Sequence, residues 1–503
     1  MRANPRRLRL RYVFAIAPLM GLALGSAPAA ARPPLPHILL IVADDLGWRD
    51  VGYHGSEIET PHIDRIAREG LELDRFYAQP SCSPTRTALM TGKSPLRLGI
   101  DRPISKNERT GLPLDETILP QRLGRLGYRS LMVGKWHLGH YRPEYLPLAR
   151  GFEHFYGNVT GGVGYWDHNH GGGHDWQRNG VTLREEGYTT HLVADEATRL
   201  VAAHDPAEPL FLYAAFQAPH LPNEAPDAAI ARYSSIEDEN RRVHAAMVSE
   251  LDEAIGRVLG AFDARGMLDD TLVFFASDNG GATPAAAPPA ARAVMGRLAD
   301  WFGRPLPVAG AELLAVNVLD GGSDNRPLSK GKGSVAEGGV RVPAALWWPG
   351  QIEGGTDTGF MTASDVLPTL LDAIGEQRSI PDDLDGRSIW PALREGHELA
   401  RPDYIVRGVE GLALYRPPWK LVDPDDPKLY DVYEDPGEER DVAGEHPSLV
   451  AEMAAAAHAW PRGTGALDRS LIQIFWDPDS FGGPEDREPW ADAAARRAKP
   501  SGP

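Results

Sequence analysis

His37-Ile-Leu-Leu-Ile-Val42 is a short, continuous apolar run that ends in Ala43-Asp44-Asp45. Runs of this length and composition are typical of buried strands in a parallel sheet. The residues that follow such a strand lie at its carboxyl end. We therefore expect this strand to deliver the carboxylates of Asp44 and Asp45 to one edge of a sheet.

Two later runs repeat this form. Leu210-Phe-Leu-Tyr-Ala-Ala-Phe216 is followed by Gln217 to His220, and Thr271-Leu-Val-Phe-Phe-Ala276 is followed by Ser277-Asp278-Asn279. Between them, apolar residues recur every three or four positions from Arg241 to Arg265, which predicts an amphipathic helix. Alternating strands and helices favour a layered α/β fold, in which polar side chains beyond the strand ends gather in one crevice. That crevice is expected to hold Asp44, Asp45, His220, Asp278 and Asn279.

The sequence pattern changes past about residue 400, where the apolar runs become short and turns separate them. Four short runs separated by turns predict a small antiparallel sheet, with a helix near Ser448–Trp460 packed on it. These runs are Tyr404–Val406, Ala413–Tyr415, Trp419–Val422 and Leu429–Val432. We expect an α/β domain over residues 32–398 with an insertion at about 283–319, which includes a helix over Ala291–Phe302. An α+β subdomain with a polar tail from about Gly482 is expected over residues 399–503.

The first residues resemble a secretory signal. Five arginines between Arg2 and Arg11 precede an apolar stretch from Tyr12 to about Gly25, and Ala29-Ala30-Ala31 forms a small-residue cleavage site. The apolar stretch is short for a membrane span of ~20 residues. We expect cleavage of residues 1–31, export to the periplasm or the medium, and no stable membrane span afterwards. The net charge of −18 argues against a nucleic-acid partner, which needs clustered cations.

Cys82 is the one cysteine of the chain, so no internal disulfide is possible and the thiol is either incidental or reactive. Pro84 suits the first position of a helix, which would place Cys82 at or just before the N-terminus. Free backbone N–H groups make such a terminus an anion site. Arg86 would project toward the same end, and a thiol in this place is expected to have a lowered pKa.

Two further clusters carry cations and a histidine. In Gly134-Lys135-Trp136-His137-Leu-Gly139, an extended backbone would place Lys135 and His137 on one face. The glycine-rich segment Lys330–Gly339, with Lys332 inside it, fits a close approach to an oxyanion. Four of the polar side chains expected in the crevice offer oxygen atoms as metal ligands. Such ligands suit a hard divalent cation, Ca²⁺ more readily than Mg²⁺. These donors are Asp44, Asp45, Asp278 and Asn279.

The loop from Tyr165 to Trp176 leaves three interpretations open. Its histidines, His168, His170 and His174, could form a zinc site. Alternatively, Trp166 and Trp176 could stack on sugar rings while His168 or His170 meets a second anionic group of a substrate. A surface loop without chemistry is the third interpretation.

Cys82-Ser-Pro84-Thr-Arg86 matches the Cys-x-Pro-x-Arg signature of the type I sulfatases, in the alkaline phosphatase superfamily. The resemblance extends in order from about residue 36 to 460, through Asp44–Trp48, Gly134–Gly139, Ala218–His220, Ser277–Gly281 and Lys332–Pro343. The segment from Gly134 to Gly157 resembles most the arylsulfatase B-like branch, which includes N-acetylgalactosamine-4-sulfatases. The resemblance implies a large mixed, mostly parallel sheet between helices.

For the chemistry, the resemblance implies that a maturation enzyme oxidises Cys82 to formylglycine. One hydroxyl of the hydrated aldehyde would attack sulfur, assisted by Arg86, Lys135 and a calcium ion, to give a covalent sulfate ester. His220 and Lys332 would bind sulfate and protonate the departing alcohol. His137 would deprotonate the second hydroxyl and so release sulfate. The calcium ligands would be Asp44, Asp45, residue 82, Asp278 and Asn279.

The substrate expected from this resemblance is a sulfated carbohydrate or an aryl sulfate ester. A phosphatase or phosphonate monoester hydrolase of the same superfamily is the nearest alternative. An inactive carbohydrate-binding relative is a second, but every expected polar position is filled in this chain. Two features depart from the family pattern. The role of Lys330 is open, and the insertion at 283–319 is longer than usual.

Overall fold

The computed structural model describes residues 35–463 except 106–107, 171–172, 284–320 and 396–400. The predicted signal segment (1–31), nearly all of the 283–319 insertion with its helix, and the polar tail lie outside the described residues. The expected domain boundary at 398/399 also falls outside them. In the described part of the chain, no helix combines the length and apolar character needed to cross a membrane.

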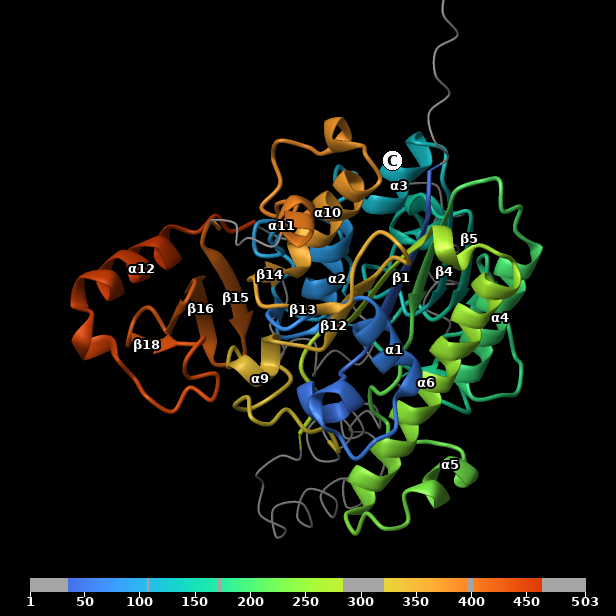
Figure 1. The fold of residues 1–503 in the computed structure, drawn as a ribbon, viewed down its shortest axis with the longest axis horizontal. Helices are drawn as coiled ribbons and strands as arrows, with labels where there is room; N and C mark the ends of the chain where they lie inside the picture. Colours follow the sequence, from blue (N-terminus) through green and yellow to red (C-terminus); the bar gives the residue numbers. More distant parts are fainter. Residues whose placement is uncertain (1–34, 106–107, 171–172, 284–320, 396–400, 464–503) are drawn as a thin grey trace, which may run out of the picture. The chain divides into compact units, whose positions relative to one another are not determined.

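A ten-stranded mixed sheet forms the centre of the fold, with strands in the order β13-β2-β12-β11-β1-β10-β4-β5-β8-β9 (Figure 1). The strand β1 (His37–Ala43) is parallel to β10 (Leu210–Ala215) and to β11 (Thr271–Ser277), with Ile38 opposite both Phe211 and Leu272. Two further parallel strands follow β10, namely β4 (Arg129–Gly134) and β5 (His154–Gly157). The three apolar runs thus form adjacent strands, as predicted.

Antiparallel strands complete both edges of this sheet. On one side β12 (Ala344–Trp347) is antiparallel to β11 and to β2 (Leu71–Leu73), and β13 (Gly355–Asp357) joins β2 in parallel. On the other side β8 (Gln177–Arg178) and β9 (Val181–Thr182) follow β5. The prediction of a large mixed, mostly parallel sheet is confirmed.

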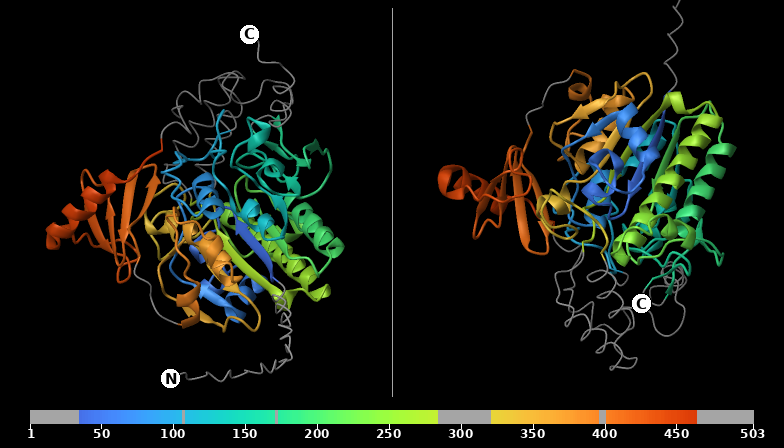
Figure 2. Two further views of the ribbon diagram at one scale, coloured as in Figure 1. Left: turned by 90° about the horizontal axis from the view of Figure 1, so that it is seen from above. Right: turned by 60° about the horizontal axis from the view of Figure 1, so that its bottom comes forward.

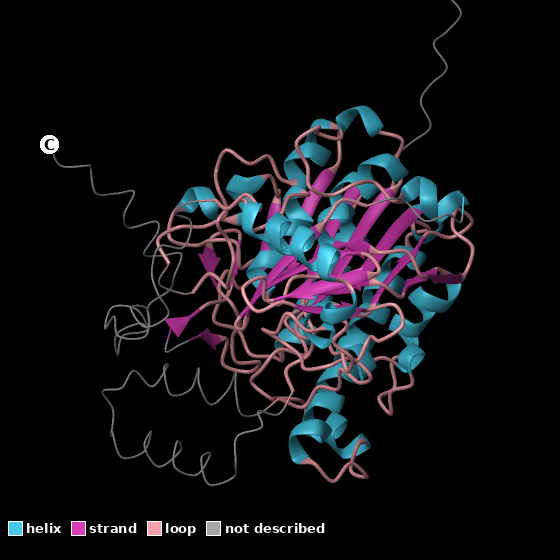
Figure 3. Cartoon of the chain, turned by 90° about the vertical axis from the view of Figure 1, so that its left-hand side faces the viewer, coloured by secondary structure: helices cyan, strands magenta, loops and turns pink. Residues whose placement is uncertain are grey.

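Helices cover both faces of the sheet, and β1 shows why. All seven of its residues are buried, and alternate side chains join opposite cores: Leu39 and Ile41 pack into one, Ile38 and Leu40 into the other. The first core lies under α1 (Pro61–Glu69), α4 (Thr189–Ala203), α5 (Asp227–Arg232) and α6 (Glu239–Ala264). The second lies under α2 (Cys82–Thr91), α3 (Leu119–Arg125), α10 (Val366–Ala373) and α11 (Trp390–Glu395). Figure 3 shows the strands between these helices.

The amphipathic helix expected over Arg241–Arg265 is α6, which begins two residues earlier. Asp238 is its N-cap, and the Asp238 side chain accepts a hydrogen bond from the Arg241 N–H (2.8 Å). A capping carboxylate satisfies an N–H group that has no partner within the helix, so the helix starts there.

A four-stranded antiparallel sheet, β15-β16-β17-β18, follows the main part of the chain, as predicted (Figure 2). Its strands are Tyr404–Gly408, Gly411–Arg416, Trp419–Val422 and Lys428–Asp431. The helix α12 (Pro447–Ala459) packs on one face through Met453 and Ala457. The other face shares a core with the main part, in which Tyr415 meets Tyr77 and Phe360.

Short elements complete the described chain. The short strands are β3 (Phe76–Tyr77), β6 (Asn169–His170), β7 (Gly173–His174) and β14 (Met361–Thr362), and α9 spans Glu337–Val340. Single 3-10 turns are η1 (Trp48–Asp50), η2 (Gly52–His54), η3 (Pro143–Tyr145), η4 (Pro147–Arg150), η5 (Leu268–Asp270), η6 (Ala363–Asp365), η7 (Gln377–Ser379) and η8 (Ala443–Glu445).

Candidate active site

Parallel strands bring the predicted site residues to one edge of the sheet. Asp44 and Asp45 directly follow β1, Asp278 follows β11 and Lys135 follows β4. The carboxyl ends of these strands lie side by side, so polar residues far apart in sequence become neighbours. The N-terminus of α2 reaches the same edge with Cys82.

Cys82 is the first residue of α2, and Ser81 is the N-cap. Pro84 is therefore the third helical residue rather than the first. The thiol is 2% exposed and donates a hydrogen bond from Sγ to Oδ1 of Asp44 (3.3 Å). The expectation of a lowered thiol pKa is wrong in this structure, because burial and then the Asp44 carboxylate raise the pKa of Cys82. The sequence pattern shows the helix terminus but not the carboxylate beside it.

Three cations, two buried and one partly exposed, each pair with one of three buried carboxylates. Arg86 donates from Nε and Nη2 to Oδ2 of Asp278 (3.0 and 2.8 Å). Lys135 Nζ lies 2.5 Å from Oδ2 of Asp44, and Lys332 Nζ lies 2.6 Å from Oδ2 of Asp45. The centre combines formal charges of both signs away from water, which is stable only with close pairing.

Their surroundings shift the pKa values of two carboxyls in opposite directions. Burial alone would raise the pKa of Asp45, but Lys332 and His220 hold it well below its usual range. Burial and the nearby Asp44 raise the pKa of Asp278 to about 6, against the opposing effect of Arg86. Asp278 therefore depends on its cationic partner to stay ionised.

The donor set fits a hard divalent cation. The ligand atoms of Asp44, Asp45, Cys82 and His220 lie within 4.8 Å of one another. Asn279 donates from Nδ2 to Asp45 (2.7 Å), while its buried Oδ1 has no hydrogen-bond partner within the described part of the chain. The oxygens of Asp44, Asp45 and Asn279 are ligands of the kind that hard cations prefer. Asp278 belongs to the same cluster, because its Oδ1 accepts from the Asp45 N–H (3.3 Å).

The two predicted catalytic histidines are held by backbone carbonyls, which fixes their tautomers. A carbonyl only accepts, so His137 carries its proton on Nε2, 2.9 Å from the Ile104 oxygen, and His220 on Nδ1, 2.6 Å from the Leu221 oxygen. His137 Nδ1 is buried without a partner among the described residues, and His220 Nε2 lies 3.7 Å from Asp45.

Both rings are neutral at pH 7. Burial, followed by Lys135 and Arg86, lowers the pKa of His137. Burial and Lys332 lower the pKa of His220 to about 3. His137 has a positive φ of 57°, so the segment with Lys135 is not extended at that residue, contrary to the prediction. This change of backbone conformation comes shortly after β4 ends at Gly134.

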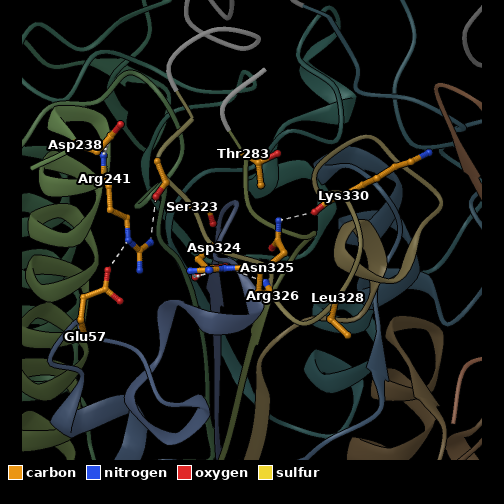
Figure 4. A pocket seen from close by; sticks show the side chains of 11 residues that line it. Glu57, Asp238, Arg241, Thr283, Ser323, Asp324, Asn325, Arg326, Leu328 and Lys330 are labelled. Carbon is orange, nitrogen blue, oxygen red and sulfur yellow. Dashed lines mark hydrogen bonds and ion pairs between the residues drawn. The ribbon is translucent and has the colours of Figure 1, made fainter. Parts of the chain in front are cut away.

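Lys332 and Lys330 lie in different places. Lys332 reaches Asp45, whereas Lys330 is exposed and pairs with Glu410 (3.0 Å). A surface pocket of about 480 Å³ lies on the Lys330 side, next to the backbone that carries Lys332 (Figure 4). Its described lining has polar side chains apart from Gly322 and Leu328 and has no aromatic residue. Figure 4 labels Arg241, Arg326 and Asn325 in this lining.

The loop from Tyr165 to Trp176 differs from its prediction. Trp176 is 1% exposed and donates from Nε1 to Glu185 (2.8 Å), so it cannot stack on a sugar ring. His168 and His174 are buried, with Nε2 bonded to the carbonyls of Gly187 and Leu183. These two residues hold the loop together, and the loop histidines are not part of any metal-ligand group among the described residues.

Trp166 and His170 remain accessible in that loop. Trp166 is 49% exposed, with its ring 5.1 Å from that of Tyr188. His170 lies close enough to His137 to contribute to its lowered pKa, after burial, Lys135 and Arg86. His170 therefore lies near the site, and Trp166 is exposed enough to contact a ligand.

Sequence reasoning missed several residues that shape the site. A Cβ atom at Gly161 would come 2.9 Å from the His137 ring, and one at Gly162 would come 3.2 Å from the His220 ring. The Tyr165 hydroxyl donates to the His220 carbonyl (2.8 Å). The Gly161-Gly162 pair was the available signal, because paired glycines mark close approaches.

The protein-family model described as Sulfatase matches residues 36–376. Mouse arylsulfatase J is 35% identical over 387 residues, which cover 74% of this chain and 58% of that protein. Human N-acetylgalactosamine-6-sulfatase is 32% identical over 403 residues, which cover 76% of this chain and 70% of that protein.

Solved structures share this fold. The crystal structure of Ps i-CgsB in complex with k-i-k-neocarrahexaose is 28% identical, with a TM-score of 0.73. The alignment covers 88% of this chain and 97% of that one. PsFucS1 sulfatase from Pseudoalteromonas sp., at 24% identity and a TM-score of 0.65, shares the fold.

Proposed function

The chain belongs to the sulfatase family, and on that premise we propose that it is a sulfuric ester hydrolase that acts on a sulfated carbohydrate. One observation carries the proposal. Cys82, at the N-terminus of α2, lies among three buried carboxylates and three cations, of which Arg86 and Lys135 are buried and Lys332 is partly exposed. A helix terminus and several cations together provide the field that an attacked sulfate group needs.

We propose that Cys82 is converted to formylglycine by a maturation enzyme. The hydrated aldehyde supplies two hydroxyls on one carbon, one that attacks sulfur and one whose deprotonation releases sulfate. We further propose that Asp44, Asp45, Asp278, Asn279 and the modified residue 82 hold Ca²⁺, which supplies positive charge beside the nucleophile.

The cationic and histidine side chains of the site have separate roles in the proposed reaction. Lys135 and Arg86 hold Asp44 and Asp278 in place and stabilise negative charge that grows on the sulfate oxygens. His137 is neutral with a free lone pair on Nδ1, as a general base requires. Lys332 keeps its protons, because Asp45 raises its pKa against the effect of burial, and it has partial access to solvent.

These protonation states refine the roles implied by the resemblance. His220 is neutral and carries its proton on the nitrogen that faces Leu221, so its Nε2 offers a lone pair to the site. We propose that Lys332 protonates the departing alcohol and that His220 Nε2 accepts a hydrogen bond from a hydroxyl of the bound sugar.

A carbohydrate sulfate is favoured over an aryl sulfate by the surroundings of the site. The pocket beside Lys330 presents hydroxyl, amide and charged groups, which suit sugar hydroxyls rather than a flat ring. Trp166 and His170 offer a stacking surface and a polar contact. The 4-sulfatase branch stays a prediction, because the relatives include an arylsulfatase J and a 6-sulfatase. We also propose export by cleavage of residues 1–31.

The test begins with the mass of the peptide that spans residue 82, from protein made in the presence of a maturation enzyme. A loss of about 18 mass units relative to cysteine is expected, from thiol to aldehyde. The same preparation is assayed on sulfated sugars, an aryl sulfate, a phosphate monoester and a phosphonate monoester, with Cys82→Ala as the control. Preference for a phosphate or phosphonate ester would favour the alternative hydrolase, and an unmodified thiol would argue against the mechanism.

A further inference from the structure

A buried ion network joins the C-terminal sheet to the segment that carries Lys332, which we call the lysine loop (residues 329–339). Lys420 on β17 and Glu337 at the start of α9 are both 0% exposed. Lys420 Nζ lies 3.1 Å from Oε1 of Glu337 and 2.7 Å from Oε1 of Glu438. Figure 1 shows α9 next to this sheet.

The network holds the lysine loop at both ends. Glu438 accepts hydrogen bonds from the Ser329 hydroxyl (2.5 Å) and the Glu337 N–H (2.8 Å). Glu337 also accepts from the hydroxyls of Tyr77 and Tyr415, both at 2.8 Å. The polar groups of the network are therefore satisfied, which a buried network requires to be stable.

The loop between these ends is fixed against the nucleophile segment. The Lys332 N–H donates to the Gly281 carbonyl (3.1 Å), and the Gly333 N–H donates to the Pro80 carbonyl (2.8 Å), two residues before Cys82. A displacement of the loop ends would thus move Lys332 relative to Cys82.

We propose that Lys420, with Glu337 and Glu438, is a positioning group for Lys332, so that the C-terminal sheet completes the catalytic site from outside the main sheet. The inference rests on the proposed function through the role of Lys332 as proton donor. A positioned group loses its effect when it is displaced by as little as about 1 Å, which costs about 10²-fold in rate.

The first experiment measures the effect of Lys420→Met on two kinds of substrate. Proton donation matters for a sugar sulfate, whose alkoxide is a poor leaving group, and little for 4-nitrophenyl sulfate. We expect kcat/KM to fall about 10²-fold on the sugar sulfate and about tenfold or less on the aryl sulfate. In a Lys332→Met background, Lys420→Met should add less than about twofold, because the two changes remove the same interaction. Equal losses on both substrates, or additive losses, would overturn the inference.

A second experiment does not need activity. Amide hydrogen exchange of peptides within 329–339 should be faster in Lys420→Met than in the wild-type protein. The milder Glu438→Gln variant should show the same change, and it provides the test if Lys420→Met fails to fold. Arg416→Met is the matched control, because Arg416 on β16 pairs with Asp403 (2.7 Å) away from the loop. Unchanged exchange would overturn the inference. If the variants exchange faster but the wild-type protein hydrolyses no sulfate ester, the network is supported and the proposed function is contradicted.

Discussion

Arg86→Met tests whether the buried pairs govern both stability and chemistry. Arg86 is fully buried and makes two hydrogen bonds to Asp278 and a third, from Nη1, to the Lys135 carbonyl (2.8 Å). The change leaves Asp278 as a buried carboxylate without its cation. Removal of one partner of such a pair costs ~3–5 kcal/mol in the free energy of unfolding. Loss of one charge-stabilising group costs ~10²–10³-fold in kcat.

Arg86→Lys separates charge from geometry in the same experiment. Lysine keeps the charge but cannot reproduce the planar set of donors to Asp278 and the Lys135 carbonyl. We expect it to recover part of the stability and less of the activity.

The measurements are urea unfolding followed by tryptophan fluorescence and kcat on a sulfate ester. Arg65→Met is the control, because Arg65 pairs with Glu69 on the surface of α1 (3.0 Å), where a pair contributes ~0–1 kcal/mol. An Arg86→Met loss no larger than that of the control would refute the reasoning that Asp278 depends on Arg86.

Three further predictions address the metal, the loop and pH. Chelation should lower the melting temperature, and Ca²⁺ should restore it more fully than Mg²⁺; saturation at 100 times Kd corresponds to about 2.7 kcal/mol. Trp166→Ala should raise KM for a sugar sulfate without loss of stability, whereas Trp176→Ala should cost ~3–5 kcal/mol, as chemical unfolding would show. Burial raises the pKa of Asp252 to about 7 although it accepts the N–H groups of His62 and Ile63. The native state thus holds a proton that the unfolded chain releases above about pH 4, so Asp252 lowers stability as pH rises from about 4 to about 7. Asp252→Asn should gain stability relative to wild type between pH 5 and pH 8 in urea titrations, and a constant difference would contradict the shift.

The fold was predictable where one pattern repeated. The apolar runs that became β1, β10 and β11 are buried on both faces, so their composition alone indicated central parallel strands. Their polar termini then placed Asp45 and Asp278 together without any structural information. The family resemblance indicated Lys332 rather than Lys330 as the site lysine, and the structure places Lys332 at Asp45.

Burial and tautomers were not predictable in the same way. Trp176 and His168 looked like ligand contacts in the sequence, yet their rings stack on each other with centroids 4.9 Å apart inside the loop. An aromatic or histidine side chain serves equally well in a core and in a binding site, and only tertiary contacts decide between them. The raised pKa of Cys82 has the same origin, because it comes first from burial and then from Asp44, which follows β1 and lies 38 residues away in the sequence.

The formal charge of the site differs from the negative net charge of the whole chain. The whole protein carries −18, yet Asp44, Asp45 and Asp278 are balanced by Arg86, Lys135 and Lys332, so the centre is formally neutral with both histidines uncharged. A divalent cation held by these carboxylates would make the centre positive by two charges, and a sulfate monoester carries one negative charge. Because interactions in a buried site are screened far less than those at the surface, this local balance outweighs the distant acidic surface in the binding of an anionic ester. Among the described residues, Arg86, Lys135 and Lys332 each pair with a carboxylate, so a bound cation would supply the net positive charge that meets the sulfate.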